Sequence, residues 1–169
     1  STSDMAAIMA NGLAGKVDEK EFSEALNFVC MSLAREIAKD GEGATKLVEV
    51  HVNNARSAKD AKKIAKSIIS SNLVKCAMFG NDPNWGRILC AMGNSGGNFK
   101  EGKVDVYFGS HKIVGKGITA GFDSEKVKQA MGKDEIKVTI DLNDGKCHAV
   151  SFGCDMSLDY VNINALYRT

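Results

Sequence analysis

The chain has 169 residues, a length that suits one domain or two small ones with a real buried core. Its 22 basic and 21 acidic residues leave a net charge of +1, so composition gives no overall bias toward nucleic acid or a membrane surface. No stretch of the sequence has the length and apolar character of a membrane-spanning helix. We therefore expect no nucleic-acid partner and no membrane partner.

The cysteine pattern indicates a reducing compartment. The chain has five cysteines, an odd number, with none in C-x-x-C spacing, and most lie in apolar runs as buried free thiols do. We therefore expect a cytosolic (cytoplasmic) protein, and the scattered histidines add no metal site. The residues concerned are Cys30, Cys76, Cys90, Cys147 and Cys154, with His51, His111 and His148.

Two helices are predicted at the start of the chain. Ser3 suits the N-cap of a helix over residues 5–10, and Gly12 suits its end. The second helix has the clearer signal, because its apolar residues recur every three or four positions and Asp18 with Glu21 resembles a capping box. The apolar stripe consists of Phe22, Ala25, Leu26, Val29, Leu33 and Ile37.

A glycine-rich loop at residues 40–46 separates the second helix from a predicted strand at residues 47–52. A phosphate-binding loop follows a strand and leads into a helix, whereas this loop has the reverse context and carries two acids. Glu42, which lies between two glycines, has the chemistry to bind a substrate amine. Before any resemblance is considered, a solvated turn is the favoured interpretation.

The next helix is predicted over residues 57–69, with four lysines on its outer face. Since no aromatic residues interleave these lysines, a solvated face is favoured over a basic binding patch. The lysines are Lys59, Lys62, Lys63 and Lys66.

The only proline and the only tryptophan, Pro83 and Trp85, lie in a polar turn at residues 80–87. The apolar run 73–79 before the turn predicts a buried strand, and the run 88–92 after it predicts a short helix capped by an asparagine of the turn. Polar groups at a strand end are typical of sites on α/β sheets. A well-capped turn beside a buried indole is an equal alternative.

The second half of the chain has an α+β pattern. A flexible connector at residues 94–98 suggests a boundary between a main domain, residues 1–93, and a smaller subdomain, residues 99–169. A docked C-terminal tail would place Asn164 and Thr169 along a cleft, and the alternative is a last edge strand. The other predicted elements are a hairpin at 104–108 and 112–114, a helix at 124–131, and a second hairpin at 136–142 and 147–154.

Spacing alone reveals no nucleophile paired with a base, so the residues predict only an α/β domain with a polar turn. Several blocks nevertheless resemble, in order, the C-terminal part of the β chain of the ornithine acetyltransferase (bifunctional glutamate N-acetyltransferase) family of arginine biosynthesis. The two most specific are Asp-Gly-Glu-Gly-Ala-Thr-Lys at 40–46 and Asp-Pro-Asn-Trp-Gly-Arg at 82–87. The weaker blocks are Ser1-Thr2-Ser3-Asp4, Leu73-Val74-Lys75 and Tyr160-Val161-Asn162-Ile163-Asn164-Ala165.

This resemblance implies an α/β fold of the family's α+β sandwich type and a precursor that cuts itself before a threonine. That threonine becomes the nucleophile and passes acetyl from N-acetylornithine to glutamate through an acetyl-enzyme, and some members also accept acetyl-CoA. The resemblance implies no cofactor, an α chain that supplies oxyanion-hole donors, and an α2β2 assembly. It also implies that Glu42, Asn164 and Thr169 bind substrate, with Glu42 facing the ammonium group.

One departure from the family affects the expected activity. The family cleaves within an Ala-Thr-Met-Leu motif, whereas here Ala44-Thr45 is followed by Lys46. The family's β chain begins upstream of the residues that match Ser1, so we expect this chain to lack the nucleophile and to be inactive alone. The alternative function is a small metabolite-binding module without chemistry.

Overall fold

The computed structural model describes residues 5–166. The chain falls into two compact units, Ser1–Leu33 and Ala34–Thr169, which are treated separately below. In the first unit, residues 5–10 have no regular secondary structure, so the helix expected there is wrong. Isolated helices this short are marginal in water, and Gly12, at φ 73°, turns the chain directly afterward. The expected N-cap at Ser3 lies outside the described residues.

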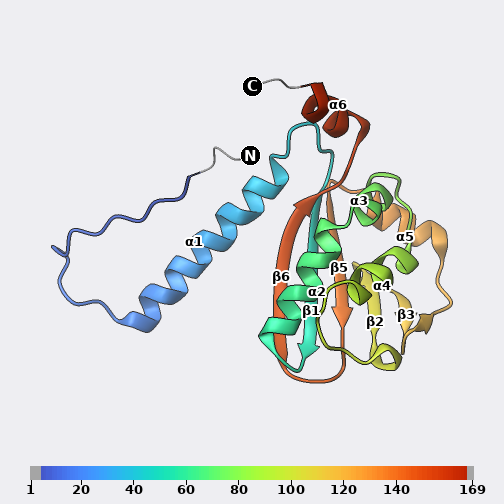
Figure 1. The fold of residues 1–169 in the computed structure, drawn as a ribbon, viewed down its shortest axis with the longest axis horizontal. Helices are drawn as coiled ribbons and strands as arrows, with labels where there is room; N and C mark the ends of the chain where they lie inside the picture. Colours follow the sequence, from blue (N-terminus) through green and yellow to red (C-terminus); the bar gives the residue numbers. More distant parts are fainter. Residues whose placement is uncertain (1–4, 167–169) are drawn as a thin grey trace. The chain divides into compact units, whose positions relative to one another are not determined.

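The second predicted helix is confirmed as α1, Glu19–Lys39 (Figure 1). The Asp18 side chain accepts hydrogen bonds from the backbone N–H groups of Lys20 and Glu21, both at 2.9 Å, as an N-cap does. Its apolar stripe is largely exposed rather than buried, with Phe22 at 52% and Leu33 at 57% exposure.

The second unit is built on one six-stranded mixed sheet in the order β4-β3-β2-β5-β1-β6 (Figure 1). Strands β1 and β5 are parallel, and every other neighbouring pair is antiparallel. The predicted α/β class is thereby confirmed as a mixed α/β fold. The strands are β1 (Leu47–Ala55), β2 (Asp105–Phe108), β3 (His111–Gly115), β4 (Ile118–Thr119), β5 (Glu135–Asp141) and β6 (Cys147–Cys154).

The first predicted hairpin is confirmed by the antiparallel pair β2–β3. The second is wrong, because β1 lies between β5 and β6 and hydrogen-bonds with both. The turn after β5 passes over the end of β1, where the Asp144 N–H donates to the Asn54 carbonyl at 2.9 Å. A turn motif predicts that the chain reverses, but it does not identify the strand beside which the chain returns.

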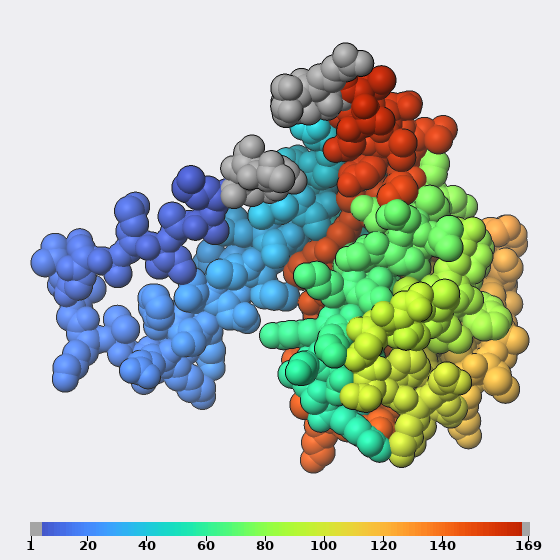
Figure 2. Space-filling model, viewed as in Figure 1, coloured from blue at the N-terminus to red at the C-terminus, as the bar shows by residue number. Residues whose placement is uncertain are grey.

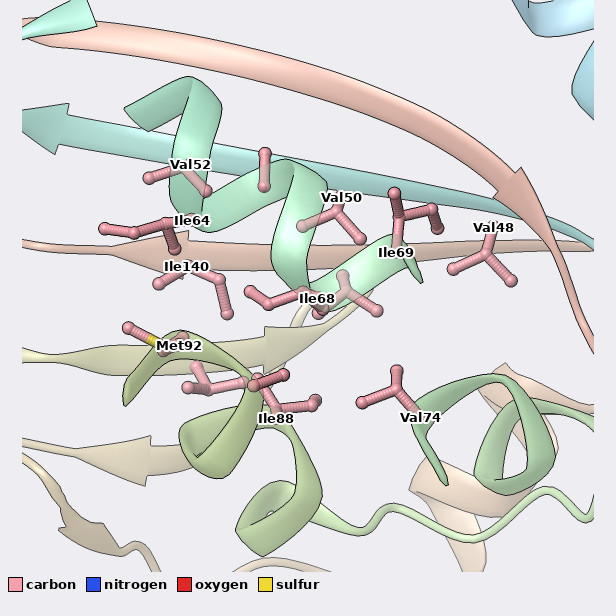
Figure 3. Packing of buried hydrophobic residues seen from close by; sticks show 14 of the residues in the cluster. Val48, Val50, Val52, Ile64, Ile68, Ile69, Val74, Ile88, Met92 and Ile140 are labelled. Carbon is pink, nitrogen blue, oxygen red and sulfur yellow. The ribbon is translucent and has the colours of Figure 1, made fainter. Parts of the chain in front are cut away.

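One face of the sheet is covered by α2 (Ala58–Ser70), α3 (Asn72–Phe79) and α4 (Trp85–Gly93) (Figure 1). Valines of β1 and isoleucines of α2 interdigitate there with residues of α4 and β5 in a continuous buried core (Figure 3). The helix predicted at 57–69 is confirmed, with Ser57 as its N-cap. The lysines on its outer face are exposed.

The run 73–79, predicted as a strand, belongs to helix α3. The Ser71 side chain caps this helix by accepting from the Val74 N–H, and the buried residues Val74, Ala77 and Met78 follow helical spacing. A short apolar run does not by itself distinguish a buried strand from a buried helix. The turn at 80–87 is therefore a corner between two helices and not the end of a strand.

The connector at 94–98 follows α4 and precedes a short 3-10 turn, η1 (Glu101–Lys103). Because β1 pairs with β5 and β6, residues on both sides of the connector contribute strands to the same sheet. The division into 1–93 and 99–169 stays a prediction. The helix predicted at 124–131 is confirmed as α5 (Ser124–Met131), capped by Asp123.

The tail beyond β6 forms helix α6, Leu158–Leu166, so the alternative of a last edge strand is wrong for these residues. The cysteines differ from expectation as well, since Cys30, Cys76 and Cys90 are exposed and only Cys154 is buried. Between residues 5 and 166, no helix is long and apolar enough to cross a membrane. Within that same range, no cluster of three His, Cys, Asp or Glu side chains could hold a metal ion.

Candidate functional site

The loop that carries Glu42 is fixed to the buried carboxylate of Asp155. We call residues 40–46, which join α1 to β1, the Glu42 loop. Asp155, with no exposed surface, accepts hydrogen bonds from the Thr45 N–H at 2.8 Å, the Thr45 hydroxyl at 2.6 Å and the Lys46 N–H at 3.0 Å. The Asp155 N–H donates back to the Lys46 carbonyl at 3.1 Å. The second half of the loop therefore continues the β1–β6 ladder.

The middle of the Glu42 loop contacts the first turn of α6. The Ser157 hydroxyl donates to the Gly43 carbonyl and accepts from the Tyr160 N–H at 2.9 Å, so Ser157 caps α6 while binding the loop. Gly43 has φ 77°, and a Cβ at this position would lie 2.6 Å from backbone atoms of Asp159 and Tyr160. Only glycine fits this conformation and this approach. In Figure 2 the loop lies against the red atoms of α6.

Lys46 joins the loop to the helical corner at residues 80–87. Its ammonium group donates to the Met78 carbonyl at 2.8 Å and to the Asn81 side-chain oxygen. A cation suits this place because the last carbonyls of α3 lack helical partners. Burial lowers the pKa of the Lys46 amine, and the negative charge of Asp155 opposes this effect.

The other side of the loop follows the last turn of α1, which is held by ion pairs to the sheet. Arg35 bonds to Glu49 of β1 at 2.8 Å and to Glu135 of β5 at 2.5 Å, and Lys39 lies 3.3 Å from Glu135. Burial alone would raise the pKa of Glu49, but the hydrogen bond from Arg35 contributes to a net lowering. Both ends of the Glu42 loop are thus attached to the sheet by charged groups.

The polar side chains of the 80–87 corner are mostly engaged in local structure. The Asn84 side chain accepts from the Arg87 N–H at 3.1 Å, which confirms it as the N-cap of α4, and donates to Asp82 at 2.9 Å. The Arg87 guanidinium donates to the Leu73 carbonyl at 2.9 Å. Of the two interpretations of this turn, these contacts favour the capped turn.

Of the three residues predicted to bind substrate, Glu42 and Asn164 lie within the described part of the chain. Glu42 is exposed on its loop, and Asn164 is exposed on α6, where its amide donates to the Tyr160 carbonyl at 2.8 Å. Thr169 lies outside the described residues. The structure therefore brings the loop of Glu42 to the first turn of the helix that carries Asn164.

Several residues that hold this region together were missed by sequence reasoning. Asp155 and Ser157 are partners of the loop from more than 100 positions away. Lys75 was noted only as part of a motif, yet its ammonium group lies 4.7 Å from the centre of the Tyr160 ring and 3.7 Å from the Cys154 sulfur. No local spacing identifies such partners, because the fold alone brings β6 beside β1.

Comparison with known proteins identifies the family to which this chain is similar. The family model described as the ArgJ family matches residues 1–169. Proteins named arginine biosynthesis bifunctional protein ArgJ from Caldanaerobacter subterraneus subsp. tengcongensis and Symbiobacterium thermophilum are 48% and 45% identical over 100% of this chain. The chain spans only 45% and 44% of their respective lengths.

A solved structure agrees with these sequence matches. The crystal structure of arginine biosynthesis bifunctional protein ArgJ from Bacillus halodurans matches with a TM-score of 0.90 and 39% identity, over 99% of this chain and 82% of that chain. Family match, sequence identity and fold all lead to the same conclusion: the chain belongs to the ArgJ family.

Proposed function

We propose that this chain is the C-terminal part of the β chain of an acetyltransferase that moves acetyl from N2-acetyl-L-ornithine to L-glutamate. Acetyl passes through an acetyl-threonine intermediate, and transfer from acetyl-CoA to glutamate is a further activity of some relatives. In this proposal the chain supplies substrate-binding residues, Glu42, Asn164 and Thr169, rather than the nucleophile. The α+β sandwich type and the smaller subdomain beyond residues 94–98 belong to the same proposal.

The single observation that carries the proposal is the fixed position of Glu42. Glu42 is exposed, while the loop beyond it is bonded to Asp155 through Thr45, to the end of α3 through Lys46 and to the start of α6 through Gly43. An exposed acid on a fixed loop can pair with an ammonium group without first being ordered, which reduces the entropy lost on binding. Charge-assisted pairs of this kind orient a substrate more strongly than neutral hydrogen bonds do.

The length of the relatives supports the proposal that the nucleophile and a partner chain lie outside these 169 residues. The ArgJ relatives are more than twice as long as this chain, which spans 44% of the Symbiobacterium protein. In our proposal the remaining part contains the threonine nucleophile, upstream of Ser1, and the α chain that completes an α2β2 assembly in the cytoplasm. No cofactor is required, because a threonine hydroxyl with a terminal amine as base suffices for acyl transfer.

The test is Glu42→Gln in the full-length enzyme, which keeps the shape of the side chain and removes its charge. We expect KM for N-acetylornithine to rise about tenfold, since a hydrogen bond to a charged group contributes roughly 1.5–3 kcal/mol. Steady-state kinetics with each amino-acid substrate measure the effect. Glu101→Gln is the matched control, an exposed glutamate in η1 away from the loop. Equal kinetics for Glu42→Gln and wild type would contradict the role of Glu42.

A further inference from the structure

We infer that Asp155 is the positioning residue for the Glu42 loop, so that its carboxylate sets the affinity for the amino-acid substrate without touching it. This inference rests on the proposed function of Glu42 and adds a second residue to it. Asp155 itself has no exposed surface. It therefore acts through the loop and not as a ligand.

All the hydrogen bonds that the Asp155 carboxylate accepts come from the Glu42 loop. A buried carboxylate is costly unless donors satisfy it, and Asp155 has three, all supplied by Thr45 and Lys46. These residues are three and four positions from Glu42. The bonds from the two backbone N–H groups fix the direction in which the loop leaves the β1–β6 ladder. The bond from the Thr45 hydroxyl fixes the orientation of the Thr45 side chain. The backbone of Glu42 is thereby oriented from its C-terminal side.

The Glu42 loop also contacts two helices, α3 and α6. The Lys46 ammonium group donates to the Met78 carbonyl at the end of α3. The Gly43 carbonyl accepts a hydrogen bond from Ser157 at the start of α6. Asp155 lies at the centre of these contacts, two residues before Ser157 in the sequence. The Asp155 carboxylate thus holds the second half of a loop whose middle, at Gly43, contacts the helix of Asn164.

Asp144 is a control for Asp155, because it stabilises the fold through ion pairs without contacting the Glu42 loop. Its side chain is only 7% exposed, and it bonds Lys103 at 2.6 Å as well as the Arg56 guanidinium. It lies in the turn that packs on the far end of β1, away from Glu42. Asp144 is thus another shielded acid with charged partners, but its contacts do not reach the candidate site.

The experiment compares Asp155→Asn with Asp144→Asn in the full-length enzyme. Asparagine retains one acceptor oxygen and loses the other, so the loop keeps part of its anchorage. We expect Asp155→Asn to raise KM for N-acetylornithine at least fivefold with a smaller change in kcat. Asp144→Asn is expected to lower Tm and to leave KM within twofold. A wild-type KM in folded Asp155→Asn would overturn the inference.

A double variant shows whether Asp155 acts through Glu42. In the Glu42→Gln background, Asp155→Asn should change KM by less than twofold, because the charge that it positions is already gone. Multiplied effects of the two substitutions would overturn the inference and leave Asp155 a structural residue. If Glu42→Gln alone has no effect, the proposed role of Glu42 in substrate binding fails instead, so the two failures are distinguishable.

Thr45→Val is a second test of the same hydrogen bonds, to be used if the Asp155→Asn variant does not fold. Thr45 is exposed, and valine removes only the hydroxyl that donates to Asp155. We expect KM to rise two- to fivefold in Thr45→Val and to return to the wild-type value in Thr45→Ser. An unchanged KM in Thr45→Val would overturn the inference.

Discussion

At the residue scale, the most constrained position in the candidate site is Gly43. We expect Gly43→Ala to destabilise the enzyme by more than the roughly 1–2 kcal/mol that a left-handed backbone costs an L-residue. The excess arises because the new Cβ would lie 2.6 Å from backbone atoms of Asp159 and Tyr160, so α6 must move. KM for N-acetylornithine should rise as well. Urea unfolding and steady-state kinetics of the full-length enzyme measure both effects.

Gly96→Ala is the matched control for this substitution. Gly96 also has a positive φ, 63°, but the nearest atom to a new Cβ is the tip of Lys63 at 3.9 Å. It therefore isolates the cost of the backbone conformation from the cost of contact with α6. Equal losses of stability in the two variants would mean that the loop does not press against α6.

The sequence predicts the exposed acid of the candidate site, Glu42, but not the buried acid that holds its loop, Asp155. Glu42 could be singled out because glycines flank it, and the family resemblance then turns a solvated turn into a binding hypothesis. Asp155 could not be singled out, since its partners are 109 and 110 positions away. A carboxylate after a strand has no distinctive local signal until the neighbouring strand is known.

At the element scale, caps and periodicity predict helices well, and pairing between distant strands is poorly predicted. The helices capped by Asp18, Ser57 and Asp123 lie close to where the sequence places them. The errors are α3, whose short apolar run suits a strand equally well, and the β5–β6 hairpin, into which β1 is inserted. Parallel pairing of β1 with β5 joins segments about 90 residues apart, and no turn motif encodes it.

Gly145 lies in the turn between β5 and β6. Because β1 is inserted between these strands, we expect this position not to tolerate a larger side chain. In a simple hairpin this glycine would tolerate alanine, but here a Cβ would lie 2.1 Å from the Ala55 carbonyl oxygen of β1. We expect Gly145→Ala to cost about 3 kcal/mol or more, because neither backbone segment can yield without breaking the sheet. Thermal unfolding of the full-length protein measures the loss.

Gly132→Ala serves as the control for this element. Gly132 ends α5, and its new Cβ would make only ordinary contacts, the nearest at 3.5 Å. Its cost should stay below about 1 kcal/mol. If Gly145→Ala were equally mild, the turn would not pass closely over β1.

At the scale of the whole molecule, exposed apolar surface supports the proposal that this chain packs on the rest of a longer protein. Apolar side chains of α6 are exposed, with Leu158 at 73% and Leu166 at 78% exposure. Exposed apolar surface on a folded chain marks places where another segment or subunit packs. Because the chain spans less than half of its ArgJ relatives, the remainder of the enzyme is the partner that we expect.

The last prediction therefore concerns activity. The 169-residue chain alone should transfer no acetyl from N-acetylornithine to glutamate, because in our proposal the attacking threonine lies on the remainder. Co-expression with that remainder should restore transfer, and mass spectrometry of the complex incubated with N-acetylornithine should locate acetyl on an upstream threonine. Glu42→Gln in the reconstituted complex should reduce the acetylated fraction at low substrate concentration, because it weakens binding and leaves the nucleophile intact. Transfer by the isolated chain, or acetyl on a residue of this chain, would contradict the division of roles between the two parts.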